Sequence, residues 1–184
     1  MTSIIVEGNT PLIGSISVSG SKNSAIRLIY ASMFSNEDVM LENVPHIRII
    51  EEELDIIRSV GGTAQWVGKN TLILNGSTID TYKIPFKMAK KYRTTFLFTG
   101  VLLHRFGKAY IPKFESTGNS KSSPLNRLLD TWDNLGIVYL EDENYYMLSN
   151  ENLKPTMISF KSATNLGTAH ALILSACLYG DTVI

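Results

Sequence analysis

The sequence has little cysteine: Cys177 is the single one among 184 residues. One cysteine excludes an internal disulfide and any metal site built from several thiolates. Cys177 lies in the apolar stretch 172–178, and a free cysteine in such a setting is most often a small buried hydrophobic residue. We therefore expect Cys177 to be buried, and we expect no metal site.

The sequence also lacks an excess of charge of either sign and a long hydrophobic run. Lys and Arg together number 17, as do Asp and Glu, so no basic surface of the kind that binds nucleic acid is expected. No apolar run approaches the ~20 residues that span a bilayer, and the apolar stretch before Glu7 is too short for a signal peptide. We expect a cytoplasmic protein with neither nucleic acid nor a membrane as its partner.

The hydrophobic content of 44% is enough for a globular core, and the pattern of expected elements repeats. Equivalent positions recur after roughly 70 to 75 residues, which indicates a repeated supersecondary unit. The first helix of each copy is apolar on nearly all sides and should be buried, whereas the second is amphipathic. The third copy stops after its first helix and one strand, so we expect the intact protein to continue or a partner chain to supply the rest. The expected elements are helices 24–34, 51–60, 91–106, 125–135 and 166–179, and strands 38–42, 63–67, 71–74, 108–112, 137–140, 145–148, 157–160 and 181–184.

The segment Ser19–Ala25 carries the most information about chemistry. It joins an alternating strand, 13–18, to the first helix through a small polar turn that contains Gly20 and Lys22. Such a turn leaves backbone N–H groups free at a helix N-terminus, and Lys22 adds a positive charge, so the segment predicts an anion site. The alternative is that Gly20 only makes the turn and Lys22 is a solvated surface lysine.

Five motifs stand along the chain: Gly8–Gly14, Ser19–Ala25, Glu42–Pro45, Tyr92–Thr95 and Arg105–Gly107. Together they resemble the enolpyruvyl transferases, and within them those that act on UDP-N-acetylglucosamine. The resemblance runs along the whole chain, and it implies an inside-out α/β barrel built from βαβαββ units with buried helices. Residues 1–20 would then be strands of the other domain, and residues 21–184 an incomplete domain of units 21–76, 77–155 and a truncated 156–184.

This resemblance implies transfer of the enolpyruvyl group of phosphoenolpyruvate to a hydroxyl of a UDP-sugar in peptidoglycan precursor synthesis, without a cofactor. Such a site needs fixed cations for the phosphate and carboxylate, an acid and a base. By resemblance Lys22 contacts phosphoenolpyruvate, Asn23 lies beside it, and Arg93 faces the nucleotide sugar. The resemblance also draws a catalytic aspartate and further arginines from a second half that this chain lacks, so the chain alone should be inactive.

The segment between strand 108–112 and helix 125–135 departs from the family pattern. The family has a cysteine or aspartate acid and an Arg-Pro pair there, whereas this sequence has neither acid and reads Ser123-Pro124. Glu115 is the candidate replacement acid, and Arg127 or Lys121 the candidate replacement for the arginine, but a polar segment of this kind is also typical of a solvated connection. The family's nucleotide-contacting turn corresponds to Ser162, Thr164 and Asn165, whose polar groups can equally cap a helix.

Three functions remain open from the sequence. The first is the N-terminal part of an enolpyruvyl transferase acting on UDP-N-acetylglucosamine, or on a related nucleoside in a specialised pathway. The second is a non-catalytic paralogue that binds a nucleotide sugar. The third is another enzyme of the same broad fold that joins RNA ends, which the balanced charge and the Lys22-Asn23 motif disfavour.

Overall fold

The protein, analysed as a computed structural model, is described over residues 3–9, 11–114 and 124–184, with the side chains of residues 124–127 outside that description. Six antiparallel strands form two small sheets, and helices pack against them, so the expected α/β class is confirmed. The elements in order are α1 (Lys22–Ser32), β1 (Val39–Leu41), α2 (Arg48–Ser59), β2 (Thr63–Trp66), β3 (Leu72–Asn75), α3 (Phe86–Ala89), the 3₁₀ helix η1 (Arg93–Leu97), α4 (Phe98–Phe106), β4 (Lys108–Pro112), α5 (Pro124–Leu135), β5 (Val138–Glu141), β6 (Tyr145–Ser149) and α6 (Asn165–Ser175).

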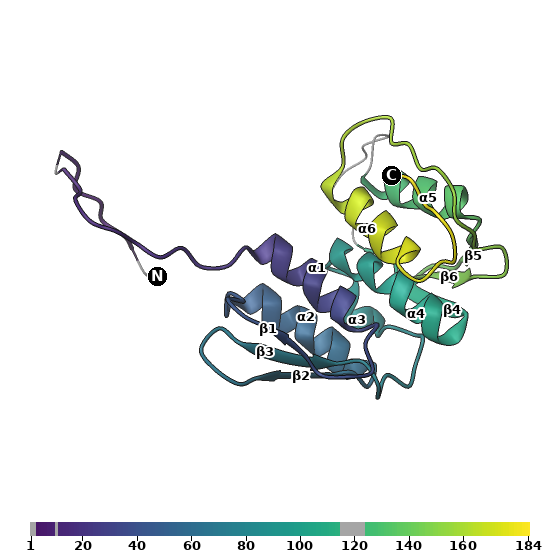
Figure 1. Cartoon of the computed structure of the whole chain (residues 1–184), viewed down its shortest axis with the longest axis horizontal. Helices are drawn as coiled ribbons and strands as arrows, with labels where there is room; N and C mark the ends of the chain where they lie inside the picture. The colour runs from purple at the N-terminus through teal and green to yellow at the C-terminus, as the bar shows by residue number, and fades with distance from the viewer. Residues whose placement is uncertain (1–2, 10, 115–123) are drawn as a thin grey trace.

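The first sheet has the strand order β1-β3-β2 and is covered on one face by α1 and α2 (Figure 1). Along β3 the side chains alternate, with Leu72 and Leu74 buried beneath the helices and their neighbours less buried. Met40, which pairs with Ile73, is largely exposed on the other face. This alternation is typical of an antiparallel sheet with one face on the core and one toward water.

The second sheet has the strand order β4-β6-β5. As in the first sheet, the last of the three strands in the sequence lies in the middle. Within β6 the buried residues are Tyr146 and Leu148. Trp132 of α5 packs edge-on against Tyr146, and stacks on Phe96 of η1 with ring centroids 5.5 Å apart. The indole N–H of Trp132 donates to Nε2 of His170 in α6 over 2.8 Å, so one buried cluster joins α5, η1, α6 and this sheet.

Helix α4 packs against both α1 and α6 (Figure 1). Its residues 98–103 are all buried, as its apolar sequence predicts. The contact with α6 is close at Gly100, where an added Cβ would lie 3.0 Å from the carbonyl oxygen of Ile173. The absence of a side chain at Gly100 therefore sets the spacing of these two helices.

The expected continuous helix 91–106 is wrong in its first half. The chain forms the short helix α3, turns, and then runs through η1 into α4. The hydroxyl of Thr95 donates to the carbonyl oxygen of Tyr92 over 2.7 Å, and Thr94 donates to a carboxylate of α2. Such side-chain bonds compete with regular helix formation, which accounts for the 3₁₀ turn.

The third copy of the pattern is shorter than expected. Strands 157–160 and 181–184 are reduced to one parallel bridge, Met157 with Val183, because the described chain offers no further strand to pair with them. Helix α6 ends at Ser175, four residues before the expected end. Cys177 therefore lies beyond the helix and is only partly buried, which corrects the expectation of a core cysteine.

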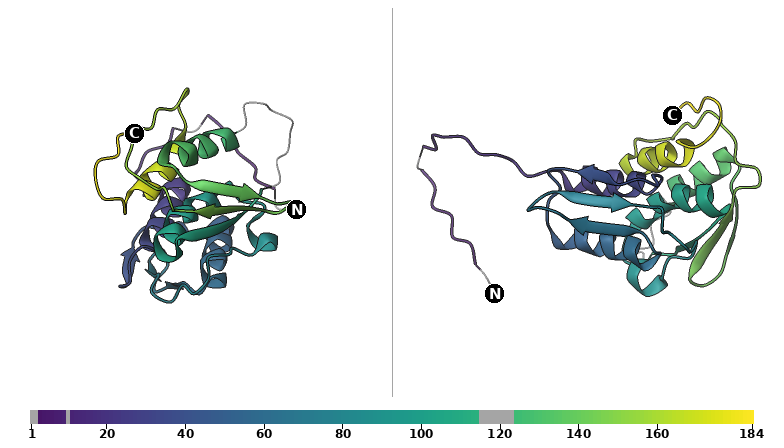
Figure 2. Two further views of the ribbon diagram at one scale, coloured as in Figure 1. Left: turned by 90° about the vertical axis from the view of Figure 1, so that its right-hand side faces the viewer. Right: turned by 60° about the horizontal axis from the view of Figure 1, so that its bottom comes forward.

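The described residues before Gly20 form an extended arm that leaves the body of the molecule (Figures 1 and 2). No strand forms within residues 3–9 and 11–20, although strand 13–18 was expected. The aliphatic side chains of the arm are 80–98% exposed, from Ile4 to Val18. The assignment of residues 1–20 to strands of another domain stays a prediction.

Candidate functional site

The turn before α1 is held in place by a close backbone contact. A Cβ on Gly20 would lie 1.7 Å from the carbonyl oxygen of Asn43, so only glycine fits where the arm passes the segment after β1. Ser21 is the N-cap of α1, and its hydroxyl accepts from the N–H of Ser24 at 3.3 Å. Lys22 and Asn23 then form the first turn of the helix and are exposed.

Helix α6 begins in a similar way, with Thr164 as the N-cap. The Thr164 hydroxyl accepts from the N–H of Gly167 at 3.1 Å, which is the capping alternative left open by the sequence. Asn165 is the first residue of α6 and is exposed. Ser162 lies in the exposed bend before it.

The 3₁₀ helix η1 begins at Arg93, which is exposed. Its guanidinium carbon lies 5.8 Å from the centre of the Phe114 ring. Within the described residues Arg93 forms no ion pair.

A pocket of about 320 Å³ lies where α1, η1 and α6 begin. Of the predicted site residues, Asn23, Arg93 and Asn165 line it together. Arg27 and Lys91 add two further cations, and the lining contains no carboxylate. We call this the cationic pocket; its lining residues are Asn23, Ile26, Arg27, Ile49, Lys91, Tyr92, Arg93, Thr94, Leu97, Asn165 and Leu166.

The helices reinforce the charge of the side chains. Helix N-termini present unpaired N–H groups and a partial positive charge, and α1 and α6 both begin beside the cationic pocket. A shallower hollow of about 500 Å³ shares Asn23, Arg27 and Asn165 with it and extends along α1 and α6. The arrangement can hold a ligand with more than one anionic group.

The other predicted site residues are not among the residues that line the cationic pocket. Lys22 is adjacent to Asn23 but does not line the cationic pocket, and neither do Ser162 and Thr164. Glu115 and Ser123 lie outside the described residues, as do the side chains of Pro124 and Arg127. Their proposed roles stay predictions.

Neither Arg27 nor Lys91 was named as a site residue from the sequence. Arg27 is four residues after Asn23, so it lies on the same face of α1, and its Nη1 donates to the carbonyl oxygen of Asn23 at 2.5 Å. That spacing was the available signal. Lys91 directly precedes the Tyr92-Arg93 pair in the chain.

Shifted pKa values occur at Tyr92 in the pocket lining and at the buried residues Glu53 and His170. Burial raises the pKa of Glu53, although hydrogen bonds from Thr94 and Tyr30 oppose the shift. Burial also raises the pKa of Tyr92 to about 12, and its bond to Glu52 adds to the effect. Burial in the apolar core lowers the pKa of His170 to about 3, so this imidazole is neutral at pH 7.

Within the described ranges no three His, Cys, Asp or Glu side chains are grouped so that they can hold a metal ion. None of the described helices combines the length and apolarity needed to cross a bilayer.

Comparison with known proteins places these features in a family. The sequence model of EPSP synthase (3-phosphoshikimate 1-carboxyvinyltransferase) matches residues 6–184. A UDP-N-acetylglucosamine 1-carboxyvinyltransferase from Treponema denticola is 31% identical over 188 residues, covering 100% of this chain and 43% of that protein. The protein of the same name from Campylobacter hominis is 28% identical, covering 97% of this chain and 42% of its own length.

Solved structures show the same fold. The enolpyruvyl transferase NikO from Streptomyces tendae superimposes with a TM-score of 0.77 at 23% identity, covering 95% of this chain and 41% of that one. EPSP synthase from Acinetobacter baumannii superimposes with a TM-score of 0.67 at 14% identity, covering 92% of this chain and 39% of that one. The chain thus spans less than half the length of the proteins it matches. From the match along residues 6–184, the chain belongs to the EPSP synthase (3-phosphoshikimate 1-carboxyvinyltransferase) family.

Proposed function

We propose that this chain is the N-terminal part of an enolpyruvyl transferase that moves the enolpyruvyl group of phosphoenolpyruvate to a hydroxyl of UDP-N-acetylglucosamine. The acceptor is taken from the names of relatives that match the chain along its whole length. The observation that carries the proposal is the cationic pocket, which places Arg27, Lys91 and Arg93 beside the first turns of α1 and α6. Both substrates are anions that such a pocket can bind.

Each residue takes a role that suits its chemistry. Arg93 binds the diphosphate of the nucleotide sugar, because a planar guanidinium can donate two parallel hydrogen bonds to a phosphate. Lys22 and Asn23, at the start of α1, bind phosphoenolpyruvate through the ammonium charge, the amide and the free helix N–H groups. Asn165 lines the pocket from the start of α6.

The whole protein is proposed to be an inside-out α/β barrel. The two sheets support this proposal because both have the order of first, third and second strand and both are covered by helices on one face. Residues 1–20 then pair with another domain, and the units 21–76, 77–155 and 156–184 belong to one incomplete domain. Further cations and the base for the acceptor hydroxyl come from the part of the protein beyond this chain.

A non-catalytic paralogue that binds a nucleotide sugar is the second candidate. It is favoured by the sequence of the segment Lys113–Pro124, which contains neither cysteine nor aspartate. Transferase activity then requires another acid, for which Glu115 is the proposed residue.

Binding titrations followed by NMR test the proposal. Addition of UDP-N-acetylglucosamine should shift the signals of Arg93 and Asn165, and addition of phosphoenolpyruvate those of Lys22 and Asn23. Arg93→Lys keeps the charge but loses the fork of donors, so it should weaken binding of the nucleotide sugar more than tenfold, or about 1.4 kcal/mol. Lys69→Arg, in the exposed turn between β2 and β3, is the charge-matched control, because it also exchanges lysine and arginine without changing the charge. Shifts confined to residues outside the cationic pocket and the start of α1 would overturn the proposal.

A further inference from the structure

The run Glu51-Glu52-Glu53 in α2 is not a uniformly solvated acidic surface. Glu53 is fully buried, and each of the three carboxylates accepts hydrogen bonds from different partners. Consecutive residues of a helix point in different directions, so a run of three can reach three parts of the fold.

Two of these carboxylates hold the residues on either side of Arg93. The hydroxyl of Tyr92 donates to Oε2 of Glu52, and the hydroxyl of Thr94 donates to Oε1 of Glu53. Arg93 lies between Tyr92 and Thr94 at the start of η1. The backbone that carries the exposed guanidinium is therefore anchored on both sides to one turn of α2.

Glu53 also fixes this anchor to α1. Its Oε2 accepts from the hydroxyl of Tyr30 at 2.5 Å, and both side chains are fully buried. A carboxylate buried with its hydrogen-bond donors is rigid, because breaking either bond leaves a buried polar group unpaired. Glu53 thereby joins α1, α2 and η1, the elements that contribute most of the cationic pocket.

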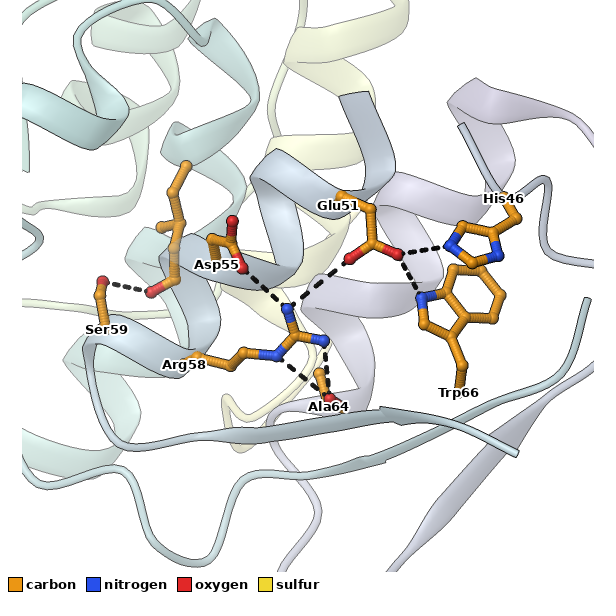
Figure 3. Close-up of polar contacts among 8 residues, drawn as sticks. His46, Glu51, Asp55, Arg58, Ser59, Ala64 and Trp66 are labelled. Atoms are coloured by element: carbon orange, nitrogen blue, oxygen red, sulfur yellow. Dashed lines mark hydrogen bonds and ion pairs between the residues drawn. The ribbon is translucent and has the colours of Figure 1, made fainter. Parts of the chain in front are cut away.

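Glu51 differs from its two neighbours and supplies an internal comparison. It accepts from the indole N–H of Trp66 at 2.5 Å, Nε2 of His46 lies 2.8 Å from the same carboxylate, and Nη1 of Arg58 lies 3.7 Å away (Figure 3). His46 stacks on Trp66 with ring centroids 4.2 Å apart. None of these residues lines the cationic pocket.

We propose that Glu52 and Glu53 are positioning residues, which act through Tyr92 and Thr94 to hold Arg93 in the orientation that binds the substrate phosphate. Neither glutamate lines the cationic pocket, so neither contacts the ligand directly. The inference rests on the proposed function, because it assigns the purpose of the anchor to an anion bound by Arg93. A segment whose backbone is already held in place loses less conformational freedom on binding, and this raises affinity without adding a contact.

The test combines affinity for UDP-N-acetylglucosamine with the NMR signal of the Arg93 backbone N–H group in the free 184-residue chain. Glu53→Leu and Glu52→Leu remove the acceptors, whereas Glu53→Gln keeps one acceptor oxygen in the same place. Thr94→Val and the double variant Glu53→Leu/Thr94→Val form a cycle that shows whether Glu53 acts through Thr94. Glu51→Leu is the matched control, since it removes a carboxylate from the same helix and the same run.

The proposal expects both Leu variants to weaken binding by about tenfold or more, which corresponds to the loss of one hydrogen bond. The Arg93 backbone N–H signal should move toward the position typical of an unstructured chain, Glu53→Gln should largely restore the parent position, and Glu51→Leu should leave the signal unchanged. The effects of Glu53→Leu and Thr94→Val on affinity should not add. Glu52 is less buried than Glu53, so Glu52→Leu remains a test if Glu53→Leu fails to fold.

Two other results separate the inference from the proposed function. If the variants lower the unfolding temperature while affinity and the Arg93 signal stay as in the parent chain, the glutamates only support the fold and the inference is wrong. If the parent chain does not bind the nucleotide sugar but Glu53→Leu still releases the Arg93 signal, the anchor is supported and the proposed ligand is wrong.

Discussion

At the scale of single residues, much of the site depends on polar groups placed out of reach of water. Glu53 and His170 are both fully buried, and burial shifts their pKa values in opposite directions, each toward the neutral form of the side chain. The carboxyl of Glu53 is shifted toward its neutral acid, and the imidazole of His170 toward its neutral base. Sequence alone gave no sign of either, because burial of a polar residue depends on packing between distant segments.

His170 should make the fold sensitive to acid. The pKa of His170 is lowered from 6.5 to about 3 in the folded chain. Below pH 6.5 the unfolded chain therefore binds more protons than the folded chain, and the free energy of unfolding falls as the pH drops from 6.5 toward 3. Between pH 6.5 and pH 5 this amounts to about 2 kcal/mol, at roughly 1.4 kcal/mol for each pH unit. Urea unfolding at several pH values checks this, with His170→Gln as the comparison. A variant that keeps the parent's acid sensitivity would show that His170 is not its source.

Gly20 should tolerate no side chain. An alanine Cβ there meets the carbonyl of Asn43 at 1.7 Å, so the turn into α1 must move. We expect Gly20→Ala to weaken phosphoenolpyruvate binding by at least tenfold, since the loss of one good hydrogen bond alone has that effect. Gly68→Ala, in an open turn where an added Cβ meets only the Thr71 side chain at 3.6 Å or more, should bind as the parent chain does.

At the scale of elements, the sequence predicted most helices and hairpins because their periodicity is strong. The position of α1 and the pairings of β2 with β3 and β5 with β6 are as expected. The helix 91–106 was misplaced in its first half because Tyr92 and Thr94 bond to α2, a contact between residues 40 and 41 positions apart that no local pattern reports. For the same reason Asn23, Arg93 and Asn165 were named singly until the fold brought them to one pocket.

Arg105 should be a structural residue that holds the C-terminal end of α1. Its guanidinium donates to the carbonyl of Met33 at 2.9 Å, to that of Ser35 at 3.2 Å and to Oδ1 of Asn36 at 3.0 Å. These carbonyls have few helical partners, so their loss leaves unpaired acceptors. We expect Arg105→Ala to lower the free energy of unfolding by about 2–3 kcal/mol, measured by urea denaturation.

Lys69→Ala is the control for Arg105, because it removes one cation from an exposed turn. It should change stability by less than about 0.5 kcal/mol. An Arg105→Ala variant as stable as Lys69→Ala would contradict the assignment of Arg105 to the end of α1.

At the scale of the whole molecule, the described chain has two regions that suggest further contacts. The extended arm carries aliphatic side chains from Ile4 to Val18 that are 80–98% exposed, and Leu28 and Leu172 are about half exposed on α1 and α6. Apolar surface of this kind usually marks an interface. The chain also spans only 39–43% of the length of the proteins compared with it above in sequence and structure.

We expect the 184-residue chain to bind ligands without turning them over. The proposed base and further cations lie beyond this chain, so phosphate release from phosphoenolpyruvate and UDP-N-acetylglucosamine should stay at the level of the buffer control. Addition of the remaining part of the protein should restore turnover, and Lys22→Ala should abolish it. Turnover by the 184-residue chain alone, lost on Lys22→Ala, would contradict the proposed division of the site.

A crystal structure of the chain with UDP-N-acetylglucosamine and phosphoenolpyruvate tests the central claim most directly. The account predicts that the diphosphate lies in the cationic pocket within hydrogen-bonding distance of Arg93, with the phosphate of phosphoenolpyruvate at Lys22, Asn23 and the first turn of α1. The account would be contradicted by ligands bound elsewhere on the chain, with Arg93 and the start of α1 making no contact to either phosphate group.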